Sequence, residues 1–251
     1  MKKLLLQHKN LNKGNPTHIY HCLPDEEFEG QFSEIFNDEQ YKKGRRRNST
    51  YIDLGANIGL AYHYFKDYAK EYFAYEPNPE LYECLLLNTK GCDNIKTYNL
   101  AVSNLDGKET LYKTKEDSPA QVIVPDTKPI GSMEVESVSM ETIFTQNNIK
   151  KCDVLKIDIE GYEFMVLPSK SFGQVASLID FIIGEGHFLG PVAFPEFIPK
   201  ILEEYGYTTR FLKSNNLIRK MFYNEQGRSK EYSLSFPTMF YAERKVDKNK
   251  K

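Results

Sequence analysis

The stretch YIDLGANIGLAY, residues 51–62, limits what this chain can fold into more than any other part of the sequence. It starts as an apolar strand, passes through Asp53 into a turn bracketed by Gly55 and Gly59, and restarts as an amphipathic helix. Because glycine has no Cβ and Asn57 tolerates left-handed dihedral angles, this backbone can turn sharply and approach a ligand closely. The helix is expected to carry its apolar side chains on one face: Ile58, Ala61 or Tyr62, Phe65 and Ala69.

The spacing of the glycines separates the classes of nucleotide site. A dinucleotide fold uses G-x-G-x-x-G, but counting from Gly55 the later glycines would fall at Asn57 and Leu60. A phosphate-binding loop is excluded too, since no Gly-Lys-Ser/Thr follows. The pattern fits the D-x-G-x-x-x-G turn of Rossmann-like methyltransferases, whose ligand S-adenosylmethionine has no pyrophosphate. Asp53 agrees with this, because an acid before the turn suits a ligand with an ammonium and a sulfonium and repels a phosphate.

Length and composition predict one α/β domain with appendages, because 251 residues with 40% hydrophobic content fill a single core. The net charge of −2 provides no basic field for nucleic acid or an anionic membrane. Four scattered cysteines predict neither a zinc site nor a disulfide framework, which favours a reducing cytoplasm. We expect neither a secretory leader nor a membrane span, because no run approaches ~18 apolar residues.

The second strand is predicted over Tyr72–Tyr75 and ends at Glu76. In mononucleotide folds, an acid at the end of the second strand accepts hydrogen bonds from the ribose hydroxyls. The alternative is a surface acid in a turn. Pro77 stops the strand, Asn78 can cap a helix, and a helix is predicted over 79–88.

A third strand is predicted over 94–100, and it runs into Ala101, Val102 and Ser103. By position, these three residues would line an adenine ring, with a small side chain leaving room for it; an ordinary passage from strand to loop is the alternative. From 104 to 138, short alternating pieces separated by turn residues predict a β-rich insertion that would shape an acceptor site. A helix is predicted to follow at 140–149.

A second group of charged residues lies in CDVLKIDIEGYEF, residues 152–164. The apolar residues predict a buried central strand, yet Lys156, Asp158 and Glu160 are interleaved with them. Charges are costly to bury without partners or purpose. The ligand crevice of an open parallel sheet lies at the carboxyl ends of its strands, where Asp158 and Glu160 fall. Lys156 is interpreted as the group that neutralises these acids, and Gly161 is expected to open the next helix.

The next predicted strand, 178–183, delivers Glu185 and His187 to the same edge of the sheet. Two adjacent strands that end in acids beside a histidine form a candidate general-base site or cation site. His187 is the preferred base, because an ordinary histidine pKa near ~6.5 leaves it mostly neutral. Glu185 would orient His187 or help to hold the acceptor. With Asp158 and Glu160, Glu185 would alternatively gather a divalent cation.

The end of the chain is predicted to close the sheet. A helix is expected over 195–205 and two last strands over 207–212 and 237–243, as an antiparallel hairpin. Residues 215–233 between them are polar, and 246–251 form a charged tail. Earlier in the chain, 26–41 predicts a helix, and the basic run 42–48 predicts a solvated loop rather than an anion clamp.

Several of these segments together resemble the FkbM family of S-adenosylmethionine-dependent methyltransferases. The segments that carry the resemblance are IDLGANIG (52–59), AYEPNPELYECLLLN (74–88), NLAVSN (99–104), LKIDIEGYEFMVL (155–167) and EGH (185–187). The resemblance implies a Rossmann-like class I methyltransferase fold, with a mostly parallel seven-stranded sheet and helices on both faces. It implies O-methylation of a hydroxyl, commonly on a sugar, glycan or polyketide. The match weakens after Leu167, so the acceptor is not fixed.

The resulting hypothesis divides the chain into an N-terminal appendage (1–47), a methyltransferase domain (48–245) and the tail. For the cofactor, Gly55, Asn57 and Gly59 would contact the methionine end, Asp53 would order their turn, Glu76 would hold the ribose, and Asp158 would bind the ammonium. The alternatives are a nucleic-acid or protein methyltransferase, an NAD-binding oxidoreductase and a binding module without catalysis. No prediction is made about oligomeric state.

Overall fold

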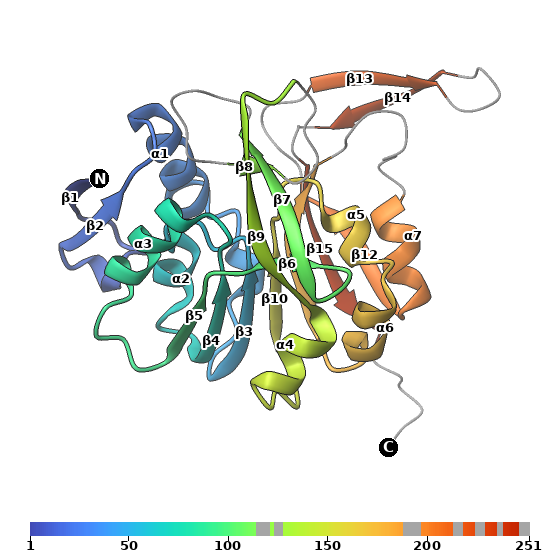
Figure 1. Cartoon of the computed structure of the whole chain (residues 1–251), viewed down its shortest axis with the longest axis horizontal. Helices are drawn as coiled ribbons and strands as arrows, with labels where there is room; N and C mark the ends of the chain where they lie inside the picture. The colour runs from blue at the N-terminus through green and yellow to red at the C-terminus, as the bar shows by residue number, and fades with distance from the viewer. Residues whose placement is uncertain are drawn as a thin grey trace.

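A seven-stranded sheet forms the centre of the computed structural model, which describes residues 1–113, 121–122, 128–187, 197–212, 218–223, 229–234 and 238–245 (Figure 1). The strands lie in the order β12-β15-β11-β10-β3-β4-β5. Their bounds are β3 Ser49–Leu54, β4 Ala69–Tyr75, β5 Ile95–Tyr98, β10 Val154–Ile157, β11 Phe181–Gly186, β12 Tyr207–Phe211 and β15 Thr238–Arg244.

The sheet is parallel apart from one strand. Strands β5, β4, β3, β10 and β11 pair in parallel, whereas β15 is antiparallel to both β11 and β12. This confirms the predicted fold class, including the antiparallel closure by the last two strands. The strand order reverses between β3 and β10, and ligands of open α/β sheets bind at such a switch point.

Each face of the sheet is covered, because successive side chains of a strand point to opposite faces. Ile52 and Leu54 of β3 belong to one core, and Tyr51 belongs to the other. The first core is covered by α4 Met140–Gln146, α5 Glu163–Val166, α6 Lys170–Ala176 and α7 Phe197–Glu204. The second is covered by α1 Asp25–Phe32, the π-helix η2 Ser33–Asn37, α2 Leu60–Phe65 and α3 Pro79–Asn88.

The sequence predicted the bounds of helix α3 correctly but not the end of helix α2. Helix α3 has the predicted bounds, because Asn78 accepts hydrogen bonds from the backbone N–H groups of Glu80 and Leu81 and Pro79 follows. Helix α2 is shorter than predicted: it ends at Phe65, and Ala69 begins β4 instead. The tight turn closed by the hydrogen bond from Tyr68 N–H to Phe65 O ends the helix, and no residue type announces it.

The predicted β-rich insertion forms a second sheet in the order β6-β9-β7-β8. Its strands are β6 Ala101–Ser103, β7 Gly107–Lys113, β8 Gln121–Val122 and β9 Gly131–Ser139. The third strand is shorter than the predicted 94–100, since β5 covers Ile95–Tyr98, and residues 101–103 form the separate strand β6, which pairs with β9. Helix α4 ends at Gln146, earlier than predicted.

The N-terminal region is more regular than its sequence suggests. It holds the antiparallel pair β1 Lys2–Leu6 and β2 Thr17–His21, with the short helix η1 Asn12–Gly14 between them. Asn88 of α3 exchanges hydrogen bonds of 2.7 and 2.8 Å with the backbone of Tyr20. Because buried residues of 11–41 share a core with β3, α2 and α3, this region packs directly on the domain. The boundary at residue 47 remains a prediction.

The positive side chains of the basic run 42–48 contact neighbouring residues of the protein. It contains the 3-10 helix η3 Lys42–Gly44, and Arg45 lies 3.0 Å from Glu39 and stacks on Tyr64. Arg46 donates to the carbonyl groups of Lys43 and Arg45. These contacts agree with a loop that leads into β3, as predicted, rather than with an anion clamp.

Near the C-terminus, the predicted polar connection carries an additional antiparallel pair, β13 Ile218–Tyr223 and β14 Ser229–Leu234. The predicted tail, 246–251, and the start of the predicted helix at 195 lie outside the described residues. Among the described residues, no helix combines the length and apolar character required to cross a bilayer.

Candidate functional site

The turn after β3 adopts the left-handed conformations that its sequence predicts. The φ angles are +77° at Gly55, +51° at Asn57 and +89° at Gly59. A Cβ on Gly55 would lie 1.8 Å from the carbonyl oxygen of Asp158, so this glycine allows the turns after β3 and β10 to touch. A Cβ on Gly59 would lie 2.8 Å from Leu85 of α3. Both glycines are therefore needed for close packing within the protein.

Glu76 holds this turn from the end of β4. Its carboxylate accepts hydrogen bonds of 2.8 Å from the backbone N–H groups of Asn57 and Asn78. Burial raises the pKa of Glu76 to about 7, although these two hydrogen bonds and the charge of Lys156 act in the opposite direction. The carboxylate keeps free lone pairs that a hydroxyl can reach, since each oxygen accepts more than one hydrogen bond.

A crevice opens at the switch point, with an empty volume of about 650 Å³. It is lined by these predicted cofactor residues: Gly55, Asn57, Glu76, Ala101, Val102 and Asp158. Three other predicted cofactor residues, Asp53, Gly59 and Ser103, do not line it. Ser103 is fully buried and donates to Glu109, so it supports the wall of the crevice from behind.

Asp53 acts on the turn through Lys156, which lies opposite it on β10. The Lys156 Nζ atom lies 3.0 Å from Asp53 Oδ1 and donates a 2.8 Å hydrogen bond to the carbonyl oxygen of Gly55. Tyr72 donates to the other oxygen of Asp53 at 2.7 Å. Lys156 also lies 3.6 Å from Asp158, so it partly neutralises the acids as the sequence indicates. This buried network orders the turn.

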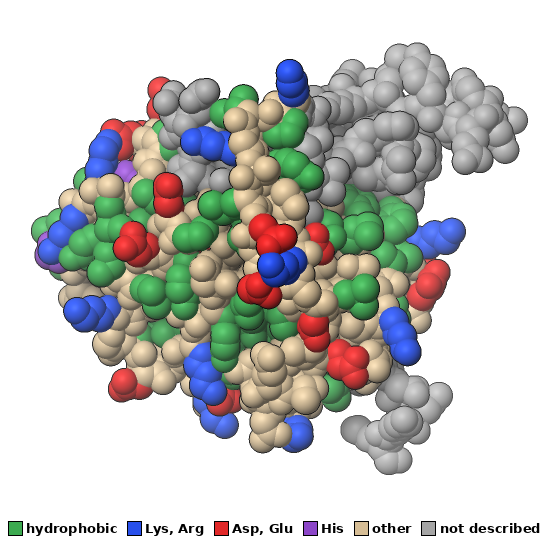
Figure 2. Space-filling view, in the orientation of Figure 1, with side chains coloured by type: hydrophobic (Ala, Val, Ile, Leu, Met, Phe, Trp, Pro, Cys, Tyr) green, Lys and Arg blue, Asp and Glu red, His purple; other side chains and the backbone are tan. Residues whose placement is uncertain are grey.

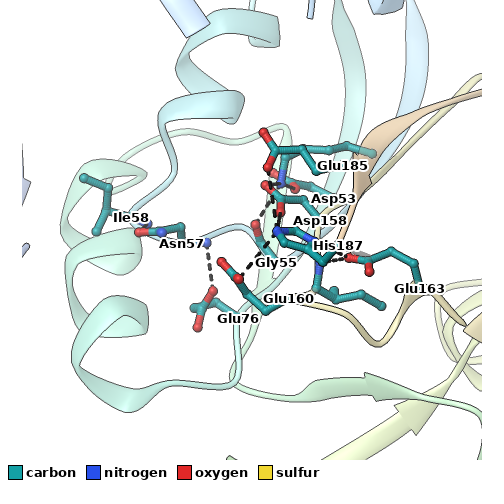
Figure 3. Close-up of polar contacts among 12 residues, drawn as sticks. Asp53, Gly55, Asn57, Ile58, Glu76, Asp158, Glu160, Glu163, Glu185 and His187 are labelled. Atoms are coloured by element: carbon teal, nitrogen blue, oxygen red, sulfur yellow. Dashed lines mark hydrogen bonds and ion pairs between the residues drawn. The ribbon is translucent and has the colours of Figure 1, made fainter. Parts of the chain in front are cut away.

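Three carboxylates surround one nitrogen of His187 at the neighbouring edge (Figure 3). The Nε2 atom lies 3.5 Å from Glu160, 3.7 Å from Glu185 and 3.9 Å from Asp158. His187 and Glu185 are nearly buried, with side chains 12% and 13% exposed. The structure thus brings together Asp158, Glu160, Glu185 and His187, which the sequence assigned to one edge. We name these four residues the acid cluster.

Glu163 completes this arrangement, and the sequence analysis assigned it no role. Its fully buried carboxylate lies 3.2 Å from His187 Nδ1 and accepts the backbone N–H groups of Ile159 and Gly161. Because Glu163 is the acceptor for Nδ1, Nδ1 carries the proton and Nε2 faces Asp158, Glu160 and Glu185. Helix α5 therefore begins at Glu163, not at Gly161. The sequence feature that could have identified Glu163 is an acid at the start of a helix that follows a turn, where a carboxylate accepts free backbone N–H groups.

The expectation of an ordinary pKa for His187 is wrong. Burial alone would lower this pKa, but the hydrogen bond and charge of Glu163, together with Glu160 and Asp158, outweigh burial and raise it to about 10. The pKa of Glu185 is raised well above its usual value by burial and by the charge of Asp158. Without a ligand, His187 is therefore protonated at neutral pH, because the acid cluster holds excess negative charge.

The predicted set of cation ligands also changes. Ligand atoms of Asp158, Glu185 and His187 lie within 4.8 Å of one another, whereas Glu160 is not part of this group. Such a mixed carboxylate and imidazole set suits a divalent transition metal better than the purely acidic set expected from the sequence.

A second cavity adjoins the crevice. Both are lined by Gly55, Asn57, Asp158 and Glu160, and the second cavity extends past Glu185 and His187. Its opposite wall comes from the N-terminal region, through these residues: Glu27, Gly30, Gln31, Glu34 and Tyr41. We call it the acidic chamber. No pattern in the sequence predicted that α1 and η2 would contribute to the site.

Comparison with known proteins finds relatives over this same region. A family model described as the methyltransferase FkbM domain matches residues 53–209, which is more than half of the chain. The curated hexuronic acid methyltransferase AglP of Haloferax volcanii is 26% identical over 167 residues. That match covers 65% of this chain and 65% of the length of that protein.

Solved structures of methyltransferases resemble this chain with lower sequence identity than the Haloferax relative. The methyltransferase FkbM of Methylobacillus flagellatus has a TM-score of 0.45 and 13% identity, covering 78% of this chain and 43% of that chain. The precorrin-6y C5,15-methyltransferase of Geobacter metallireducens has a TM-score of 0.45 and 12% identity, covering 83% and 87%.

Proposed function

The chain belongs to the FkbM methyltransferase family, and we propose that it transfers a methyl group from S-adenosylmethionine to a hydroxyl group of a sugar, glycan or other small acceptor. The observation that carries this proposal is the continuity of two cavities at the switch point. One is the crevice beside Glu76, and the other is the acidic chamber beside His187.

The residues of the crevice fit the methyl donor. Glu76 offers free lone pairs for ribose hydroxyls, and Ala101 and Val102 offer small apolar contacts to a base. Asp158 and Glu160 line both cavities, so they would accept the positively charged methionine end. The donor supplies a methyl group on a positively charged sulfur. Asp53 and Gly59, which we expected near the donor, are assigned supporting positions instead.

The His187–Glu163 pair is proposed to remove the proton from the acceptor hydroxyl. Glu163 holds Nδ1, so Nε2 is the atom that takes the proton. A positive charge bound beside Asp158 and Glu160 lowers the pKa of His187, because it cancels the charges that raised it. His187 is thus readied as a base only when the crevice is filled. Glu185 would orient the acceptor.

A sugar acceptor is supported by the family resemblance and by the name of the Haloferax relative, although that name specifies a hexuronic acid, which carries a carboxylate. A nucleic-acid acceptor is not favoured, because the basic run is consumed locally and the net charge is −2. On the face shown in Figure 2, the Lys and Arg side chains stand apart from one another rather than forming a basic stripe. The cytoplasm remains the expected location.

Calorimetry with S-adenosylmethionine and its demethylated product tests the donor. We expect saturable binding of both, and no binding of NAD, because the glycine spacing does not suit a pyrophosphate. Binding of NAD without binding of S-adenosylmethionine would replace the proposal with an oxidoreductase. A methyl-transfer screen over sugars, lipids and polyketides then identifies the acceptor.

His187→Ala tests the base. We expect turnover to fall ~100-fold to ~10,000-fold while donor affinity changes little, because a positioned base acts only on the acceptor proton. His18→Ala on β2, an exposed histidine, is the matched control and should leave turnover unchanged. Near-normal turnover of His187→Ala would show that the base is assigned wrongly.

A divalent cation is the second candidate for this role, because Asp158, Glu185 and His187 form a compact ligand group. A cation there would lower the pKa of the acceptor hydroxyl directly. Dialysis against a chelator separates the two mechanisms. Loss of turnover that returns with added Mn²⁺ or Zn²⁺ would favour the cation, whereas unchanged turnover would favour the His187–Glu163 pair.

A further inference from the structure

The acidic chamber has an unusual wall. Glu27, Gly30, Gln31 and Glu34 recur at helical spacing along α1 and η2, so one face of this segment lines the chamber. The opposite face carries Phe28, Ile35 and Phe36, which are buried in the core shared with β3 and α2. The segment changes to a π-helix at Ser33–Asn37, a distortion that occurs frequently at functional sites.

The carboxylates in the chamber divide into two sets. Asp158 and Glu160 also line the crevice, so they neighbour the proposed donor. Glu27, Glu34 and Glu185 line only the chamber, so they neighbour the proposed acceptor. Glu34 lies close enough to the first set that its pKa is raised, by burial first and then by the charge of Asp158. The chamber thus concentrates negative charge.

Among the residues that the structure describes, two positive groups line the chamber, and both already have partners. Lys156 pairs with Asp53 and bonds to Gly55 O, and only 4% of its surface is exposed. Nδ1 of His187 is held by Glu163, and Nε2 faces the three carboxylates of the acid cluster. Lys156 is therefore not placed to bind an anionic group of an acceptor, and the charge of His187 is already offset by the carboxylates around Nε2.

Tyr41 supplies an independent indication of what enters the chamber. Its side chain is 2% exposed and lines the chamber, and no described residue forms a hydrogen bond with its hydroxyl. The hydroxyl oxygen is not among the fully buried, unpartnered polar atoms of the described residues, so it stays accessible from the chamber and can bond a ligand. Burial, Asp158 and Glu185 raise the pKa of Tyr41 well above its usual value, so the group stays a neutral phenol. A neutral hydroxyl of the ligand is a suitable partner.

We propose that the acidic chamber selects acceptor sugars without negative charge, that Glu34 sets this selectivity, and that Tyr41 hydrogen-bonds the sugar. The proposal rests on the proposed function, which assigns this chamber to the acceptor. A carboxylate on the sugar would be repelled by Glu34 and Asp158, and an effective dielectric near ~20 makes that a ~10-fold to ~100-fold loss of affinity. Uncharged and amine-bearing sugars avoid this loss.

The test compares three methyl glycosides that differ only in charge: the glucoside, the 2-amino-2-deoxyglucoside and the glucuronoside. Binding is measured by saturation-transfer NMR on the full chain in the presence of the demethylated cofactor, so that no reaction occurs. We expect the glucuronoside to bind at least ~10-fold more weakly than the glucoside, and added salt to reduce the difference.

Variants assign the selectivity to residues. Glu34→Gln should narrow the difference between glucuronoside and glucoside ~3-fold to ~10-fold, with little change for the glucoside. Glu29→Gln, on the adjoining helix α1 and outside the chamber, should leave the difference unchanged. Tyr41→Phe should weaken all three glycosides ~3-fold to ~10-fold alike.

Equal or tighter binding of the glucuronoside would overturn this proposal and leave the proposed function intact. An equal effect of Glu29→Gln and Glu34→Gln would overturn the assignment to Glu34. If the demethylated cofactor binds and none of the three glycosides does, both this proposal and the sugar acceptor are wrong. If the cofactor itself fails to bind, the proposed function is wrong first.

Discussion

The site has two halves with different electrostatics: the turn after β3, which we call the organised half, and the acid cluster. In the turn after β3, polar groups are satisfied by the protein, since Glu76 accepts two backbone N–H groups and Lys156 bonds to Gly55 O. In the acid cluster, carboxylates instead face one another across His187 at 3.5–3.9 Å. The turn is thus organised before any ligand arrives, whereas the cluster has more carboxylates than the positive groups Lys156 and His187 can neutralise, and so favours a further positive charge.

Lys156 contacts both halves, so Lys156→Met should cause the largest loss in the free energy of unfolding. It leaves Asp53 buried and charged, and breaking a buried ion pair costs ~3–5 kcal/mol. Urea unfolding at neutral pH measures this loss. The double variant Lys156→Met with Asp53→Asn should recover most of the stability, because no uncompensated charge remains. A single variant that costs under ~1 kcal/mol would show that the two halves are independent.

Gly55→Ala tests the contact between the two turns. The Cβ would lie 1.8 Å from Asp158 O, and φ is +77°, so we expect a loss of ~2–5 kcal/mol with weaker donor binding. Gly91→Ala is the matched control, because its φ is +79° but nothing lies within 4 Å. It should cost only ~1–2 kcal/mol. Equal losses in thermal unfolding would mean that the close approach at Gly55 is unimportant.

Glu76 gives the organised half a distinct pH dependence. Burial raises its folded pKa to about 7 from the ordinary value of 4.5, so the folded state binds its proton more tightly than the unfolded state. This contribution is fully present below pH ~4.5 and is lost as pH rises through ~7, by up to ~3 kcal/mol. Unfolding at pH 5 and pH 8 should show a larger difference for the wild type than for Glu76→Gln. Identical pH dependence would contradict the raised pKa.

Asn78→Ala should have the smallest effect, because it removes one cap at the end of the organised half. The side chain caps α3 through Glu80 N–H and Leu81 N–H, and losing such a cap costs ~1 kcal/mol. Chemical denaturation is sensitive enough to measure this. Donor affinity should fall only slightly, and a loss as large as that of Gly55→Ala would show that Asn78 does more than cap the helix.

Local sequence predicted the organised half well. The left-handed turn at Asn57, the cap at Asn78 and the acid at Glu76 follow from residue types and their spacing. The exact role of Asp53 did not, because its effect passes through Lys156, which is distant in sequence and adjacent only once β3 and β10 pair. The length of α2 was also missed, since a turn at Tyr68 ends it without a characteristic residue.

The sequence predicted which residues form the acid cluster, but it did not predict the raised pKa of His187. Parallel strands bring their carboxyl ends to one edge, so Asp158, Glu185 and His187 were expected together. The pKa of His187 depends on which carboxylates surround it, and Glu163 reaches it only because Glu163 begins α5. Charge interactions are set by distances of a few ångströms, which spacing along a chain does not determine.

The sequence by itself determined the strand–turn–helix unit at 51–62, the family and the edge of the sheet that carries the chemistry, because these depend on neighbouring residues. Only the tertiary structure decided that the N-terminal segment supplies Glu34 and Tyr41 to the acidic chamber. The reason is physical: a helix shows in its sequence which face is apolar, but the neighbour of its polar face is chosen by how the whole core packs.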